Sequence, residues 1–415
     1  AISVQLDSTA VGQNGVNGAA AVRLAAKENN PDHGHAPIRL RAMAGLPAKE
    51  SVTIQDLATY IHVPISAHVY SFSFVRLLAC RHGSTAYNNC GEKCKCHFGS
   101  LINCIRIRKE FTAMSLEERR RYISAIKRAS TDQRFRRDYE NLINMHQRLF
   151  FELIHEAQQF LPWHRWFILQ YENLLRRVDC KVTVAFWDWS LDSNPWDASN
   201  EQELWHSGDS GFGGNGRRGC VQDGPFRQGV WSAVSPTGQK CLNREFRGIP
   251  PDAVAVREVI LQNNFVNFER QLRVNLHDQV HCLIGGTMCS IESASAPEFF
   301  LHHGFIDKIW DDRQKRTRNY AWRQESLMGS GGVQATAVTN LSQQPGGVRV
   351  EYEASQRENR IMSRLKGKSI EQLHNTKRKS FTNLLEASLR LFQVSAEEAK
   401  KVKEDEKILQ PVSAG

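Results

Sequence analysis

The chain has 415 residues, of which 41% are hydrophobic and 24% charged, enough for one core of roughly 200 residues or more with extensions around it. No run of about 18 apolar residues occurs, which excludes a transmembrane helix on sequence grounds. The net charge of +10 is modest and the basic residues are scattered, so nothing indicates a nucleic-acid module. The chain starts at Ala1 with neither a methionine nor an apolar leader, and we expect a processed mature protein.

We expect four parts along the chain. Residues 1–65 are Gly-, Asn- and Ala-rich at the start, which predicts a loosely ordered N-terminal extension. Residues 66–104 form a Cys-rich lead-in to a core at 105–320, and residues 321–415 form a linker and a helical C-terminal extension. Within the core, residues 190–250 carry most of the glycine and predict a loop-rich insertion.

The ten cysteines fall into an even pattern. The five in the lead-in become six when Cys180 is added, and two later pairs stand close enough in sequence to close locally. This parity predicts five disulfides and an oxidising compartment. As an alternative, the C-x-x-x-C-x-C spacing beside His97 allows a zinc site, although it matches no common finger. The later pairs are Cys220 with Cys241 and Cys282 with Cys289.

The first helix of the core is predicted to start at a capping box, because Ser115 precedes Glu118 by three residues, and to run to about Arg128. The next helical stretch has the periodicity that carries His146 inward together with Leu142.

His155 and His164 are nine residues apart, about two and a half helical turns, and one straight helix would place them on opposite sides. Pro162 favours the first turn of a new helix and holds Leu161 extended. We therefore expect His155 in or near a loop and His164 in the first turn of the following helix.

His277 and His281 are four residues apart, so both rings project from one face of a helix that Gly285-Gly286 would end. Such a pair is weak on its own, because a chain with 15 histidines produces it by chance. The last core helix is predicted to carry His303 inward, while His302 points about a quarter-turn away.

These histidines form two trios, one from each half of the core. Neutral imidazole suits copper, zinc, iron and nickel, but six imidazoles without a carboxylate or thiolate favour copper. The predicted fold class is mainly α, an antiparallel four-helix bundle holding a binuclear copper site, with loop-rich insertions and disulfides. The alternative is a helical domain with buried histidines and a Trp-rich core. The six are His146, His155, His164, His277, His281 and His303.

Two longer motifs resemble the copper signatures of the type-3 copper family, which comprises tyrosinases, catechol oxidases and hemocyanins. F-L-P-W-H-R at 160–165, followed by Glu172, is similar to the first signature, and P-E-F-F-L-H-H-G-F-I-D at 297–307 is similar to the second. The resemblance covers roughly residues 105–320, and the second motif looks most like molluscan secreted tyrosinases. The chain departs from the family pattern at Ala296, where an aspartate is usual, and at Leu153, where many members have a thioether-forming cysteine.

The resemblance implies two copper ions on the six histidines, with O2 as a bound co-substrate and His302 behind the ligands. It implies a tyrosinase-type oxidoreductase that ortho-hydroxylates monophenols such as tyrosine and oxidises o-diphenols to o-quinones. By the same resemblance, Glu269 and Asp278 would hold the water that deprotonates the phenol. Asp188, Arg165 and Asp307 would orient ligands, or form buried structural ion pairs instead.

Three alternatives of function stay open. They are a catechol oxidase without monophenolase activity, a hemocyanin-like oxygen carrier, and a structural matrix protein of low activity. The expected partners are small phenols or peptidyl tyrosine and DOPA, with extracellular matrix polymers as further candidates for the basic patches. A secreted, glycosylated protein that acts in pigmentation or quinone cross-linking is expected, with a sequon at Asn340. Members of the family often cover the copper site with a C-terminal extension, so residues 348–415 are expected to dock over the metal or to serve assembly.

Overall fold

The computed structural model describes residues 2–5, 23–26, 80–191, 194–214, 219–235, 238, 240–317, 320, 325–366 and 383–408. The chain divides into two units, Ala1–Arg76 and Leu77–Gly415. The first contains one antiparallel strand pair, β1 (Ile2–Gln5) with β2 (Arg23–Ala26). The rest of the expected N-terminal extension lies outside the described residues.

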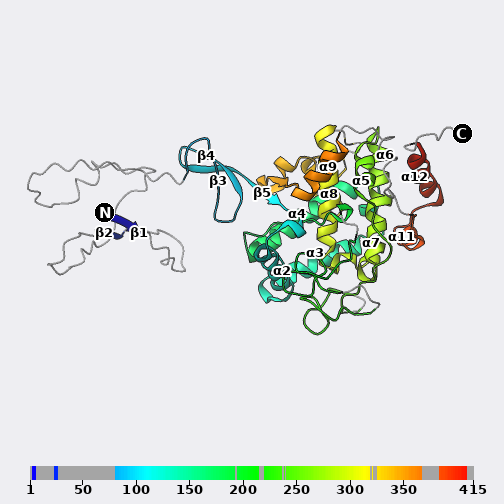
Figure 1. Ribbon diagram of the computed structural model, residues 1–415, viewed down its shortest axis with the longest axis horizontal. Coiled ribbons are helices and arrows are strands. Elements are labelled where there is room, and N and C mark those ends of the chain that lie inside the picture. The colour runs from blue at the N-terminus through cyan, green and yellow to red at the C-terminus, as the bar shows by residue number, and fades with distance from the viewer. Residues whose placement is uncertain are drawn as a thin grey trace, which may run out of the picture. The chain divides into compact units, whose positions relative to one another are not determined.

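The second unit is built on a bundle in which four helical segments surround a central helix and share an apolar core with it (Figure 1). Its central helix is α4 (Phe160–Val178), which packs against α2, α3 and α8 and has 14 of its 19 residues buried. The mainly α fold predicted from the sequence is confirmed. The surrounding segments are α2 (Leu116–Thr131), α3 (Gln133–Arg148), the π-helix η4 (Gln271–Asp278) continuing into α7 (Gln279–Ile284), and α8 (Phe299–Arg316).

The helix starts follow local chemistry. The capping box of α2 is confirmed, since Ser115 and Glu118 bond each other's backbone N–H groups, although α2 runs on to Thr131. Pro162 lies in the first turn of α4 as predicted, but the expectation that Leu161 is extended is wrong, because the helix already begins at Phe160. A proline in the first turn needs no amide acceptor, so Pro162 is accommodated inside the helix.

A small sheet precedes the bundle. Strands β3 (Thr85–Tyr87), β4 (Lys93–His97) and β5 (Ser100–Arg108) form an antiparallel meander. A late strand, β6 (Val350–Tyr352), adds to it in parallel beside β5. The C-terminal region therefore adds the last strand to a sheet whose first three strands precede the bundle in sequence.

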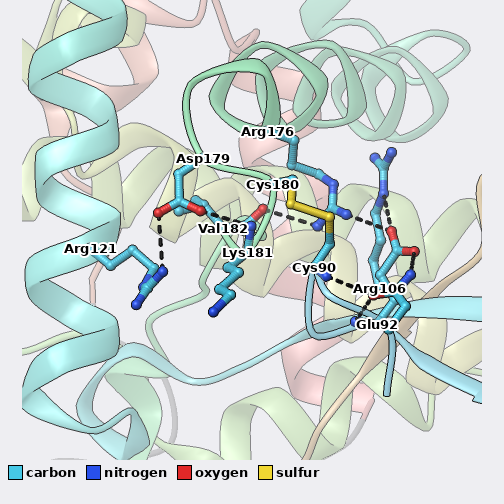
Figure 2. The surroundings of a disulfide bond; sticks show 10 residues. Cys90, Glu92, Arg106, Arg121, Arg176, Asp179, Cys180, Lys181 and Val182 are labelled. Carbon is cyan, nitrogen blue, oxygen red and sulfur yellow. Dashed lines mark hydrogen bonds and ion pairs between the residues drawn. A yellow bond between two sulfur atoms is a disulfide. The ribbon is translucent and has the colours of Figure 1, made fainter. Parts of the chain in front are cut away.

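Five disulfides join all ten cysteines, as predicted, and the zinc alternative is wrong because each of its cysteines is oxidised. Cys90–Cys180 links the meander to the end of α4, where Glu92 also accepts a 2.6 Å bond from Arg176 (Figure 2). Closing this loop, with a sequence separation of 90, stabilises the fold by roughly 4 to 5 kcal/mol in the chain-entropy account. The others are Cys80–Cys96, Cys94–Cys104, Cys220–Cys241 and Cys282–Cys289.

The described part of the loop-rich insertion is irregular after η3 (Trp189–Leu191). A fully buried ion pair fixes it to the start of α8, since Arg244 donates to both carboxylate oxygens of Glu298 at 2.7 and 2.9 Å. The remaining core elements are η1 (Phe111–Ala113), η2 (Leu153–His155), α5 (Ala253–Ile260), α6 (Phe265–Arg270), η5 (Gly286–Cys289) and η6 (Ser293–Ser295).

The C-terminal region lies on the bundle. The Gly-, Ser- and Gln-rich segment forms three short turns, of which the first two bury Ala335, Val338 and Leu341. Helix α12 contacts η4, and α11 contacts α7 (Figure 1). No helix among the described residues is both long and apolar enough to cross a membrane. The elements are η7 (Ala335–Val338), η8 (Leu341–Gln343), η9 (Pro345–Gly347), α9 (Gln356–Leu365), α11 (Glu386–Leu391) and α12 (Ala396–Ile408).

Candidate metal centre

The first three predicted histidines meet inside the bundle. His146 comes from α3, His155 ends the short turn η2, and His164 lies in α4. Their ring centroids are 5.2 to 5.6 Å apart, and one ring nitrogen of each lies within 4.8 Å of the others. All three are buried, with His155 the most accessible at 8%. This spacing suits three imidazoles around one ion.

The other three converge from η4, α7 and α8. The Nε2 atom of His303 lies 3.2 Å from the Nε2 atoms of both His277 and His281. The two trios are adjacent, since the rings of His164 and His303 stack at 4.4 Å. The six histidines therefore form one buried cluster that consists of two adjacent trios.

Backbone carbonyl groups set the tautomers of three rings. The Nδ1 atoms of His155, His164 and His281 each lie 2.8 Å from a carbonyl oxygen, which can only accept a hydrogen bond. Nδ1 therefore carries the proton, and the Nε2 lone pair is left for the centre of the site. Asp278 acts in the same way on His277, whose Nδ1 lies 2.7 Å from its carboxylate.

The histidines are neutral at physiological pH. Burial lowers the pKa of His281 to about 3 and that of His155 to about 4, and the positive charge of Arg273 acts in the same direction on His155. Burial and the neighbouring rings also hold the pKa of His146 well below its usual value. Neutral imidazole is the metal-binding form.

Several of these ring nitrogens have no hydrogen-bond partner among the described residues. Both ring nitrogens of His146 and Nε2 of His164 are buried with no hydrogen-bond partner among the described residues. Leaving such an atom unpaired costs about 1 to 3 kcal/mol, and a metal ion removes that cost. An all-imidazole set of six fits a pair of copper ions.

His302 also stands within reach of the second trio. One of its ring nitrogens lies within 4.8 Å of those of His277 and His281. However, its Nδ1 accepts a 3.2 Å bond from the indole of Trp189. A nitrogen that accepts carries no proton, so the proton of His302 lies on Nε2, and we propose His303, whose Nε2 lies 3.2 Å from Nε2 of both partners, as the third ligand.

The two predicted acid–base residues are both buried, Asp278 in contact with the second trio and Glu269 in contact with Arg273. Glu269 accepts a 2.7 Å bond from Nε of Arg273, while Asp278 bonds His277 and leaves its second oxygen without a partner among the described residues. Burial raises the pKa of both carboxyl groups, and the charge of Arg273 opposes the rise. Arg273 was missed in the sequence, where it looks like an ordinary helical arginine.

Residues from the C-terminal region cover the cluster. The Phe392 ring, at the end of α11, lies 5.3 Å from the rings of His155 and His277 and 5.5 Å from that of His281. Helix α12 is held on the bundle by polar contacts, among them Arg270 with Asp405 at 2.9 Å and Arg273 with Glu398. The sequence indicated a docked tail, but nothing in it singled out Phe392.

The residues proposed to orient ligands instead form a buried network one layer away. Asp307 accepts bonds from Arg165, Arg108 and the Tyr352 hydroxyl of β6. Asp188 accepts a bond from the hydroxyl of Ser190. The contacts of Arg165 and Asp307 favour the reading as a structural ion pair, whereas Asp188 bonds a neutral hydroxyl group.

The chain is similar to known proteins. The common central domain of tyrosinase matches residues 136–316. The chain is 32% identical over 242 residues to a tyrosinase from Streptomyces lincolnensis, covering 52% of this chain and 85% of that one. It is 31% identical over 240 residues to tyrosinase-like protein 2 from Margaritifera margaritifera, covering 52% of this chain and 51% of that one. A polyphenol oxidase structure from Thermothelomyces thermophila aligns with a TM-score of 0.48 and 18% identity over 60% of this chain and 89% of that one. The chain belongs to the tyrosinase family of type-3 copper proteins.

Proposed function

We propose that this protein oxidises phenols with O2, using two copper ions held by the two histidine trios. The observation that carries the proposal is the convergence of six neutral, buried imidazoles, three of them with Nε2 lone pairs set by carbonyl groups. Copper bound there would supply the redox chemistry that couples phenol oxidation to reduction of O2. The protein supplies the geometry, the exclusion of water and the handling of protons.

The finer proposal is that the protein hydroxylates monophenols as well as oxidising catechols. A phenol has a pKa near 10, so hydroxylation at neutral pH needs a base. Glu269 and Asp278 are buried at the second trio, and Asp278 has an oxygen with no partner among the described residues. A water held between the two carboxylates would accept the phenol proton.

Glu269→Gln should lower tyrosine hydroxylation by about a hundredfold, the usual worth of a positioned base, and leave catechol oxidation within a few-fold. Oxygen uptake by the copper-loaded protein with tyrosine and a trace of catechol measures the first rate, and uptake with catechol alone measures the second. Glu258→Gln, which replaces another buried carboxyl group in α5, is the matched control. Full tyrosine hydroxylation by Glu269→Gln would end the base assignment.

The same assay separates the alternatives. Uptake with catechol but not with tyrosine, in the wild type and in Phe392→Ala, would make the protein a catechol oxidase. Reversible O2 binding without turnover would make it an oxygen carrier. No O2 reaction in either form would favour a structural matrix protein.

We propose that the protein works outside the cell on small phenols or on peptidyl tyrosine and DOPA, in cross-linking or pigmentation. The five disulfides support an oxidising compartment. Asn340 is exposed, and its side chain accepts a bond from the Ser342 amide, so its sequon lies in an accessible turn. Expression in a secreting eukaryotic host should give protein in the medium with an N-glycan that Asn340→Gln removes. Retention of reduced protein in the cells would contradict the assignment.

A further inference from the structure

Arg273 is a buried cation on the helical segment that also carries His277. It lies in η4, one helical turn before His277, and is 7% exposed. This position on the same segment places a positive charge near the second histidine trio.

The guanidinium is shared between two carboxylates. Its Nε donates to Glu269 at 2.7 Å within the bundle, and its Nη2 donates to Glu398 at the start of α12. Glu269 is buried, whereas the Glu398 side chain is 28% exposed and belongs to the docked C-terminal region. One of the two acceptors therefore belongs to the bundle, and the other belongs to the C-terminal region.

The C-terminal region thus places two groups at the site. Phe392 puts an aromatic ring over His155 and His277, and Glu398 puts a carboxylate on Arg273. A phenolic acid has the same two groups, an aromatic ring and a carboxylate. When α12 leaves, the Nη2 donor loses its partner, and a carboxylate on a bound ligand can replace it with a charge-assisted bond.

We propose that Arg273 is a specificity-determining residue that binds the carboxylate of a phenolic acid whose ring occupies the place of Phe392. This proposal rests on the proposed function and names its substrate class. The alternative role of Arg273 is a latch that only holds α12 on the bundle. The two roles differ in whether ligand affinity depends on a carboxylate.

The test uses the full chain carrying Phe392→Ala, with 3-phenylpropionate and its uncharged amide as probes. Neither probe is a phenol, so calorimetry measures binding without turnover, with and without copper. Adding Glu398→Gln frees Nη2 and should strengthen binding of the acid about tenfold, the worth of one charge-assisted hydrogen bond, with little change for the amide. Asp405→Asn is the matched control, because it removes the neighbouring contact between α12 and Arg270 and leaves Arg273 paired.

Arg273→Gln in the same background should abolish the preference for the acid, and Arg273→Lys should restore part of it. In the copper-loaded Phe392→Ala protein, Arg273→Gln should raise KM for a catechol that carries a carboxylate and leave kcat and the KM of its amide unchanged. Equal binding of acid and amide after Glu398→Gln would overturn the proposal. A preference for the acid in a protein that oxidises no phenol would refute the proposed function and leave Arg273 as an anion anchor.

Discussion

His303→Gln is expected to reduce the copper bound per chain from two ions to one and to abolish phenol oxidation, whereas His302→Gln is expected to keep both ions at saturating copper. The reason is the direction of the rings. Nε2 of His303 lies 3.2 Å from Nε2 of both His277 and His281, while Nδ1 of His302 is engaged by Trp189.

Removing His302 should still weaken copper binding, because groups that orient a metal ligand commonly contribute about tenfold to a hundredfold in affinity. Elemental analysis after dialysis against excess copper gives the stoichiometry, and titration against a competing chelator gives the affinity. Trp189→Phe is the control, since it removes only the hydrogen bond to His302. If His302→Gln loses an ion and His303→Gln retains both, the assignment of the pair is reversed.

The sequence was sufficient for features that depend on short spacing or on parity. The relation between His277 and His281 follows from helical geometry, and Pro162 separates His155 from His164 along the chain. The even cysteine set led to five disulfides without fixing the partner of Cys90. Each of these features is determined by residues a few positions apart or by the number of cysteines.

Features that depend on distant packing were not accessible. The parallel pairing of β5 with β6 joins Arg106 to Val350, and the buried bond between Arg244 and Glu298 fixes the insertion. Nothing local distinguishes these charged residues from surface ones. Phe392 is likewise an ordinary apolar residue in sequence, and only the docking of α11 and α12 brings it onto the histidines.

Phe392→Ala is expected to raise the catechol-oxidising activity of the full chain by roughly tenfold to a hundredfold. The Phe392 ring lies over three of the six histidines and over Phe150, so a substrate ring must displace it. If only a small fraction of the molecules has Phe392 displaced, the apparent affinity for substrate is reduced in proportion to that fraction. Lowering the docking free energy by about 1.4 to 2.8 kcal/mol raises the fraction, and with it the apparent affinity, by roughly tenfold to a hundredfold.

The change should appear mainly in KM, because the copper ligands are untouched and only access is altered. Steady-state oxygen uptake at several catechol concentrations measures it. Phe98→Ala is the control, since that ring is 71% exposed on the strand meander, far in sequence from the site. Proteolytic removal of α11 and α12 should give the same gain, because their contacts at Arg270 and Arg273 hold Phe392 in place. Unchanged activity in both the variant and the cleaved protein would show that the C-terminal region does not shield the site, and its ion pairs would then serve stability or assembly alone.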